Sequence, residues 1–134
     1  METEHKFQIL ILDDEPIVCK RLKPALEKAG YEAETFTQSA MALHRITEKE
    51  FDVVITDLKM EGLDGMAFLT EVKKRYPKTE VIVITGFATM DTARQSYQKG
   101  VFDFVAKPFK LKEILDVVEN ALAKRTATEK GNVP

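Results

Sequence analysis

The chain has 134 residues, of which 44% are hydrophobic and 31% are charged. This length is enough for one substantial core and leaves no room for a second independent domain. Lys and Arg total 20 against 22 for Asp and Glu, so the formal net charge of -2 gives no overall attraction to nucleic acid or to an anionic membrane. The N-terminal residues lack the basic and apolar segments of a signal peptide. We therefore expect a cytoplasmic protein with no direct nucleic-acid or membrane binding.

Five β segments alternate with five helical segments along the chain. Pattern matching places the strands at residues 9–12, 31–36, 52–56, 80–84 and 101–105. The first, third and fourth are mainly aliphatic without polar alternation, which is typical of strands covered on both faces. The second and fifth contain Glu32, Glu34 and Asp103, so we expect these two to be outer strands. The alternation predicts an α/β fold with a doubly wound, five-stranded parallel sheet.

The helical segments carry apolar residues at i, i+4, i+7 and i+11. This spacing is found in the first helix at Val18, Leu22, Ala25 and Ala29, and in the last helix at Leu111, Leu115, Val118 and Leu122. Each set predicts one apolar stripe that packs on the sheet. We assign residues 1–125 to a single domain. Residues 126–134 contain little to bury, and we expect them to form a flexible C-terminal tail.

Polar residues follow four of the predicted strands. Asp13 and Asp14 follow the first strand, Asp57 the third, Thr85 the fourth and Lys107 the fifth. Each alone has an ordinary explanation as a helix cap, a turn residue or a solvated side chain. Ligands of open parallel sheets, however, bind at the carboxyl ends of the strands, where these residues would meet. Three carboxylates brought together repel one another unless a cation is present, and Mg²⁺ prefers oxygen ligands beside a phosphoryl group.

The ordered motifs resemble the receiver domain of two-component response regulators over about residues 7–124. The matching segments are ILDDEP at 11–16, DVVITDLKM at 52–60, GLDG at 62–65, VITG at 83–86 and FDFVAKP at 102–108. The resemblance implies the flavodoxin-like receiver fold with strand order 2-1-3-4-5. The chain is most similar to receivers of the nitrogen-regulation (enhancer-binding activator) class. Those receivers usually precede an ATPase and a DNA-binding domain, neither of which this chain contains.

The resemblance also implies a role for each residue of the predicted site. Asp57 would be the phosphoacceptor, with Thr85 bonded to a phosphoryl oxygen and Lys107 paired first with Asp57 and then with the phosphoryl group. The Mg²⁺ ligands would be Asp14, Asp57 and the backbone carbonyl of Lys59, with Asp13 acting through a metal-bound water. An ionised aspartate is already a nucleophile, so no general base is required.

Partners and output are likewise implied by the resemblance. The phosphoryl donor would be a histidine kinase or a histidine phosphotransfer protein, and the domain itself would not be an enzyme. Phosphorylation would switch the face formed by the fourth helix, the fifth strand and the fifth helix, and would thereby change either homodimerisation or the affinity for a partner. Phe104 occupies the position of the family's movable aromatic, although an ordinary core aromatic is an equally simple explanation. The resemblance further implies that the Lys107–Pro108 peptide is cis. It also ties the lifetime of the phosphoryl group to Lys59 and Phe87, which we expect to overhang the site and to restrict the approach of the hydrolytic water.

Two other classes of protein use parts of this pattern. Phosphatases of the haloacid dehalogenase type have a second aspartate two residues after their nucleophile, but here Lys59 follows Asp57 and Glu15 follows Asp13 at that spacing. Turnover of an external phosphomonoester would favour this class. A flavodoxin-like flavin carrier needs a Ser, Thr and Gly loop after the first strand, whereas the acidic residues 13–15 would repel phosphate. A colourless protein would exclude a bound flavin.

Overall fold

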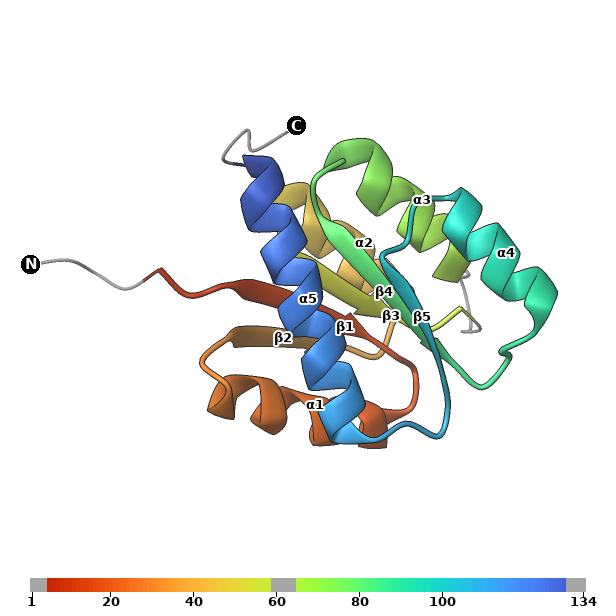
Figure 1. Cartoon of the computed structure of the whole chain (residues 1–134), viewed down its shortest axis with the longest axis horizontal. Coiled ribbons are helices and arrows are strands. Elements are labelled where there is room, and N and C mark those ends of the chain that lie inside the picture. The colour runs from red at the N-terminus through yellow and green to blue at the C-terminus, as the bar shows by residue number, and fades with distance from the viewer. Residues whose placement is uncertain (1–4, 59–64, 130–134) are drawn as a thin grey trace, which may run out of the picture.

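The chain folds into one parallel sheet between two layers of helices, in a computed structural model that describes residues 5–58 and 65–129 (Figure 1). The strands are β1 (Gln8–Leu12), β2 (Glu32–Phe36), β3 (Val53–Thr56), β4 (Glu80–Thr85) and β5 (Asp103–Ala106). They lie in the order β2-β1-β3-β4-β5, and all neighbouring pairs are parallel. The predicted fold class, strand order and outer strands are therefore confirmed.

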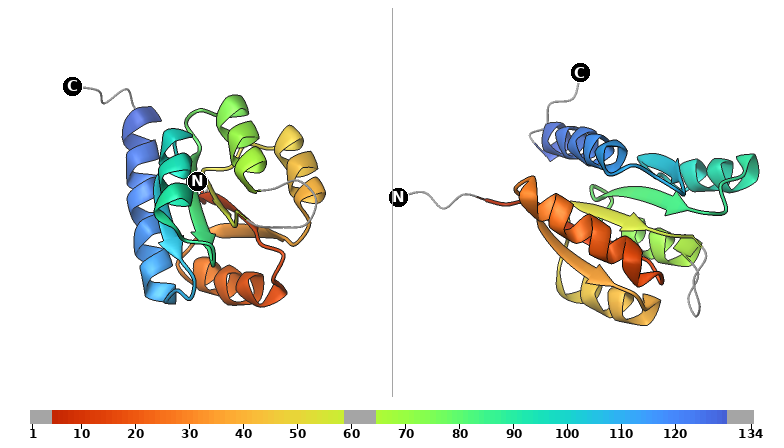
Figure 2. Two further views of the ribbon diagram at one scale, coloured as in Figure 1. Left: turned by 90° about the vertical axis from the view of Figure 1, so that its right-hand side faces the viewer. Right: turned by 90° about the horizontal axis from the view of Figure 1, so that it is seen from below.

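Five helices cover the two faces of the sheet. They are α1 (Pro16–Lys28), α2 (Ser39–Glu48), α3 (Gly65–Arg75), α4 (Met90–Gln98) and α5 (Leu111–Glu129). Helices α1 and α5 lie on one face, and α2, α3 and α4 lie on the other (Figure 2). Alternate residues of each central strand contribute to two separate cores, so that Ile9 and Ile11 face α1 and α5 while Leu10 and Leu12 face α2 and α3. Burial on both faces explains why these strands are continuously aliphatic.

Helix α1 uses a different apolar stripe from the predicted one. It buries Val18, Cys19, Leu22 and Leu26, whereas Ala29 is exposed. Leu26 is completely buried because its position, eight residues after Val18, returns to the same face of the helix and its side chain is larger than that of Ala25. The prediction from alanine spacing was therefore wrong for the second half of this helix.

Both ends of the last strand–helix unit differ from the sequence-based bounds. Strand β5 begins at Asp103 rather than 101, although Val101 is buried just before it. Helix α5 continues through Glu129, so residues 126–129, which were assigned to the tail, are helical. The remaining tail residues, 130–134, lie outside the described part of the chain, and the division into a domain and a tail stays a prediction. Among the helices described here, none combines the length and apolar character needed to cross a membrane.

Candidate functional site

Four neighbouring strands end at the carboxyl end of the sheet and place the predicted residues there. Asp13 and Asp57 directly follow the paired strands β1 and β3. Backbone hydrogen bonds continue one residue beyond the strands, from Asp57 N to Leu12 O at 3.1 Å and from Lys107 N to Thr85 O at 2.8 Å. The backbone that carries these side chains is therefore held by the sheet rather than by a free loop.

The Lys107 ammonium lies among three carboxylates. Its Nζ is 2.8 Å from Asp13 Oδ2, 2.9 Å from Asp57 Oδ2 and 2.6 Å from Glu15 Oε1. Asp13 is fully buried and Asp57 is 4% exposed. The other oxygen of Asp57, Oδ1, accepts a hydrogen bond from Leu58 N at 2.6 Å. The sequence analysis predicted the contact between Lys107 and Asp57, but it did not include Glu15 in the site.

The charges of this cluster alter the ionisation of its members. Burial raises the pKa of Asp13 above its ordinary value, and the nearby Lys107 ammonium opposes that rise. Burial alone would lower the pKa of Lys107, but its contacts with Asp13, Asp57 and Glu15 outweigh burial and hold the pKa above the ordinary value. Lys107 therefore remains a cation over the physiological pH range.

The same cluster has the donors of a hard metal ion. One oxygen from each of Asp13, Asp14 and Asp57 can be chosen so that all three lie within 4.8 Å of one another. Asp14 is exposed, so an ion could reach this group from solvent. Among the described residues, three carboxylates contact the Lys107 ammonium and Asp14 lies beside two of them, which leaves excess negative charge at the site. An all-oxygen donor set with excess negative charge fits Mg²⁺. Lys59, the fourth predicted ligand, lies outside the described residues.

The other residues named in the sequence analysis lie on or just after β4 and β5. Thr85 is completely buried at the end of β4, and its Oγ1 accepts a hydrogen bond from Phe87 N at 3.1 Å. Phe87 itself is 54% exposed. Phe104 is half-buried on β5 and packs against the core under α2 and α3. The Lys107–Pro108 peptide is cis, as the resemblance implies.

Gly65 begins α3 directly against the backbone of Asp57. Its N–H donates to Leu58 O at 2.9 Å. A Cβ atom at this position would overlap Asp57 O and crowd the Leu58 backbone, so only a residue without a side chain fits without movement of the chain. The last glycine of the GLDG motif thus brings α3 close to the site.

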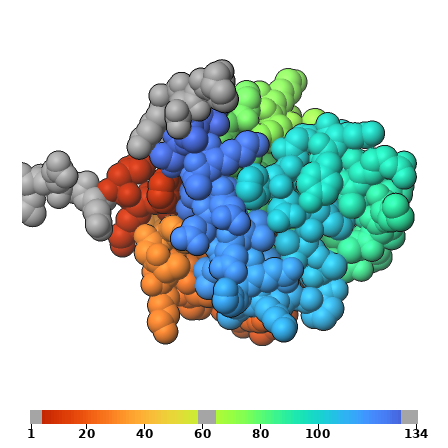
Figure 3. Space-filling model, in the orientation of Figure 1, coloured from red at the N-terminus to blue at the C-terminus, as the bar shows by residue number. Residues whose placement is uncertain are grey.

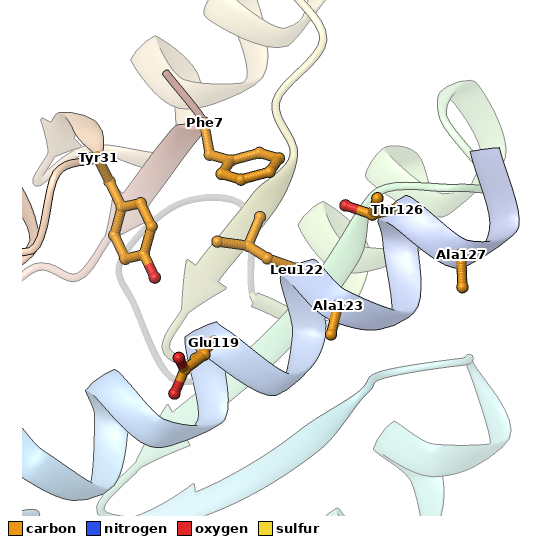
Figure 4. A pocket seen from close by; sticks show the side chains of 7 residues that line it. All are labelled: Phe7, Tyr31, Glu119, Leu122, Ala123, Thr126 and Ala127. Carbon is orange, nitrogen blue, oxygen red and sulfur yellow. The ribbon is translucent and has the colours of Figure 1, made fainter. Parts of the chain in front are cut away.

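A separate groove at the opposite end of the sheet has little of this chemistry. It has a volume of about 550 Å³ and is lined by Phe7, Tyr31, Glu119, Leu122, Ala123, Thr126 and Ala127 (Figure 4). Its walls are mainly apolar, and Glu119 is the one charged side chain among the described residues that line it. The described residues of the predicted site all lie elsewhere. The chemistry of the lining residues therefore favours the acidic cluster, rather than this groove, as the functional site.

Comparison with known protein families agrees with this assignment. The response regulator receiver domain matches residues 9–119. The chain belongs to the response regulator receiver domain family. We therefore assign the chain to this family and not to the phosphatases or flavin carriers that were considered from the sequence. The receiver fold also accounts for the observed strand order and for the position of the acidic cluster at the carboxyl ends of the strands.

Individual relatives agree with the resemblance to the nitrogen-regulation class. The receiver is 36% identical over 115 residues to the DNA-binding transcriptional regulator NtrC of Escherichia coli K12, covering 86% of this chain and 24% of that protein. It thus spans about a quarter of the length of that relative. A receiver domain protein of Clostridium thermocellum is 35% identical, with a TM-score of 0.85, and the match covers 91% of this chain and 98% of that one. The beryllofluoride-activated NtrC4 receiver domain dimer is 33% identical, with a TM-score of 0.83 and 88% and 98% coverage.

Proposed function

We propose that this receiver accepts a phosphoryl group on Asp57 in a Mg²⁺-dependent transfer from a histidine kinase or a histidine phosphotransfer protein. The observation that carries this proposal is the surroundings of the Asp57 carboxylate. It is nearly buried, lies 2.9 Å from the Lys107 ammonium and shares an acidic cluster with Asp13 and Asp14. A buried carboxylate with a cation fixed beside it is arranged for attack on a dianionic group, whose charge must be offset in advance.

In this transfer, one Asp57 oxygen forms a bond to phosphorus. The bond between phosphorus and the donor's imidazole nitrogen breaks, and the imidazole keeps the electron pair. Lys107 offsets charge on the phosphoryl group, and the Thr85 hydroxyl donates a hydrogen bond to one of its oxygens. Leu58 N–H remains bonded to Asp57 Oδ1 and orients the carboxylate. The product is an aspartyl phosphate that has not left the domain, so the receiver acts as a regulated acceptor rather than as an enzyme with an external product.

Mg²⁺ belongs to the same proposal. Asp14, Asp57 and the backbone carbonyl of Lys59 would bind it directly, and Asp13 would bind it through a water molecule. When bound, the ion neutralises negative charge on the carboxylates and on the phosphoryl oxygens. Asp13 and Asp14 therefore serve the transfer by holding the ion, while Lys107 serves it as a fixed cation of the chain.

The face formed by α4, β5 and α5 is the proposed output surface (Figure 3). All nine residues of α4 are described, and Ser96 is the only one of them that is buried. A side-chain hydrogen bond from Tyr97 OH to Asp103 Oδ1, at 3.1 Å, links α4 to β5. A helix held by so few buried contacts can change its packing at low cost. We propose that movement of Thr85 and Phe104 repositions α4 and promotes a homodimer.

Intact mass spectrometry after incubation with acetyl phosphate and Mg²⁺ tests the acceptor. The chain should gain one phosphoryl group, and Asp57→Asn should gain none. Glu32→Gln is the control, because Glu32 is an exposed carboxylate at the start of β2, at the opposite end of the sheet, and its loss should leave labelling unchanged. Labelling of the Asp57→Asn variant at the parent rate would show that another residue is the acceptor.

A further inference from the structure

Glu15 contacts Lys107 at a shorter distance than either of the two buried aspartates does. Its Oε1 lies 2.6 Å from Lys107 Nζ, compared with 2.8 Å for Asp13 and 2.9 Å for Asp57. An ammonium has three N–H donors, and three carboxylate oxygens lie within hydrogen-bonding distance of this one. A phosphoryl oxygen can therefore bind Lys107 closely only if one of the three carboxylates moves away.

The three carboxylates differ in how easily each can give up its contact with Lys107. The side chain of Asp13 is fully buried and that of Asp57 is 6% exposed. Until the phosphoryl group is bonded to Asp57, both carboxylates are charged, so either would lose its cation in a position that water reaches poorly. An unpaired buried charge is strongly destabilising. The Glu15 side chain is 58% exposed, and water can replace Lys107 as its partner. Of the three carboxylates, Glu15 therefore loses its contact with Lys107 at the lowest cost in free energy.

The backbone of Glu15 is held in place while its side chain remains free to move. Its N–H donates to Asp13 Oδ1 at 2.9 Å, and its carbonyl accepts from Val18 N at 3.0 Å. Glu15 is also the N-cap residue of α1, which begins at Pro16. The start of α1 thus holds the carboxylate within reach of Lys107, and the side chain can turn to solvent without any change in the helix.

We propose that Glu15 is a positioning residue that occupies Lys107 in the unphosphorylated receiver and is displaced from it by the phosphoryl group. This inference rests on the proposed phosphorylation of Asp57. In the resting state, Glu15 competes with the incoming group for one Lys107 donor. The strength of the contact between Glu15 and Lys107 therefore sets part of the free-energy barrier to phosphorylation. Glu15 itself takes no part in the bonds that form and break at phosphorus.

The test compares rates of phosphorylation by acetyl phosphate in Glu15→Gln and Glu15→Ala. Glutamine keeps a neutral acceptor and removes the charge, whereas alanine removes both. We expect Glu15→Ala to react about two- to fivefold faster than the parent, the range expected for loss of one largely exposed ion pair, with Glu15→Gln between the two. Glu32→Gln is the control, because it removes an exposed charge at the opposite end of the sheet and should leave the rate unchanged. Melting temperatures verify that the variants fold.

A second pair of variants tests whether the effect passes through Lys107. In a Lys107→Ala background, Glu15→Ala should no longer increase the rate, because there is no ammonium to release. The measurements are made in about 1 M salt, where the Debye length of about 3 Å suppresses long-range repulsion of the donor. Acceleration that persists without Lys107, or Glu15 variants that react no faster than the parent, would overturn this inference. Failure of the parent to be labelled on Asp57 would instead overturn the proposed function.

Discussion

The sheet carries a cluster of buried charges at each of its two ends, and the clusters differ in how many carboxylates share one cation. At the amino end, Arg125 of α5 is 6% exposed. Its Nε lies 2.8 Å from Asp52 Oδ1, and its Nη2 lies 2.9 Å from Glu50 Oε2. The second oxygen of Asp52, Oδ2, accepts a hydrogen bond from Gln8 N at 2.7 Å. This cluster ties the end of α5 to the starts of β1 and β3.

At the carboxyl end, one ammonium is shared by more carboxylates than it can neutralise. Lys107 contacts Asp13, Asp57 and Glu15, and Asp14 adds a fourth, exposed negative charge. Burial and ion pairing are present at both ends of the sheet, so neither property alone identifies a functional site. Among the described residues, both clusters hold more carboxylates than cations, because Arg125 contacts two of them. The carboxyl end is distinguished by a larger excess of negative charge, with four carboxylates to one ammonium, and by the exposed Asp14, which together allow a cation and, with it, a dianion to enter.

Removal of Mg²⁺ should produce the largest difference between the two clusters. We expect excess chelator to abolish phosphorylation by acetyl phosphate, because Asp13, Asp14 and Asp57 would repel the incoming dianion without a metal ion. Stability in urea should change little, since Mg²⁺ binds the free domain weakly and contributes little to folding. Labelling is measured by intact mass, and restored Mg²⁺ is the control. Labelling that continues at full rate in chelator would show that the excess charge does not require a metal.

Substitution at the amino end should instead act on stability. Arg125→Met removes the cation from Asp52, which is largely buried, and should lower the free energy of unfolding by about 3 kcal/mol, the lower end of values for broken buried pairs. Asp14→Asn should leave stability unchanged or raise it, because it reduces repulsion in a cluster that already has too few cations. Urea unfolding measures both variants. A similar loss of stability in the two would contradict the distinction drawn between the clusters.

We propose that the lifetime of the phosphoryl group depends on the side chains at positions 59 and 87. Phe87 is more than half exposed two residues after Thr85, and Lys59 follows Asp57 at the same spacing. We propose that both obstruct water in line with the phosphorus–oxygen bond. Lys59→Asn and Phe87→Glu should each shorten the lifetime a few-fold, with the largest change in the double variant. Decay of phosphorylated protein in Mg²⁺ is the measurement. Unchanged or longer lifetimes in all three would favour a catalytic effect of the Lys59 charge instead.

The two clusters also show which parts of the structure were predictable from sequence. Asp13, Asp57 and Lys107 directly follow strands, so a parallel sheet brings them together whatever their side-chain conformations. Arg125 follows an apolar stripe and resembles an ordinary solvated residue. Its burial depends on acids 73 and 75 positions earlier, and no local pattern contains that information.

Glu15 was missed for a different reason. Its position in the motif was known, but its contact with Lys107 depends on the conformations of two long side chains. The error in α1 has a similar cause, because the spacing of Ala25 and Ala29 fits a helical stripe while Leu26 fills the core better. Periodicity therefore predicted the elements and the end of the sheet that holds the site. Side-chain volume and long-range pairing determined the remaining contacts.

A third ion cluster, intermediate in exposure, gives the smallest expected effect and sharpens the comparison. Glu34 accepts hydrogen bonds from Arg45 Nε at 2.8 Å and from Lys49 Nζ at 3.0 Å, and its side chain is 31% exposed. The bond from Arg45 is the main cause that lowers the pKa of Glu34 from 4.5 to about 2. Because the pKa is lower in the folded state, the pair stabilises the protein above the ordinary pKa of 4.5, and this contribution is lost as the pH falls towards 2.

Glu34→Gln tests this contribution directly. The variant should lose about 1 kcal/mol or less at pH 7, because partly exposed pairs are weakened by solvent, and the difference from the parent should shrink between pH 4.5 and pH 2. Urea unfolding at several pH values provides the measurement. Glu71→Gln is a matched control, because Glu71 pairs with Arg75 within α3 at 2.9 Å on the surface and should change stability less. If Glu34→Gln cost as much stability as Arg125→Met, burial would not be the property that separates strong from weak ion clusters in this domain.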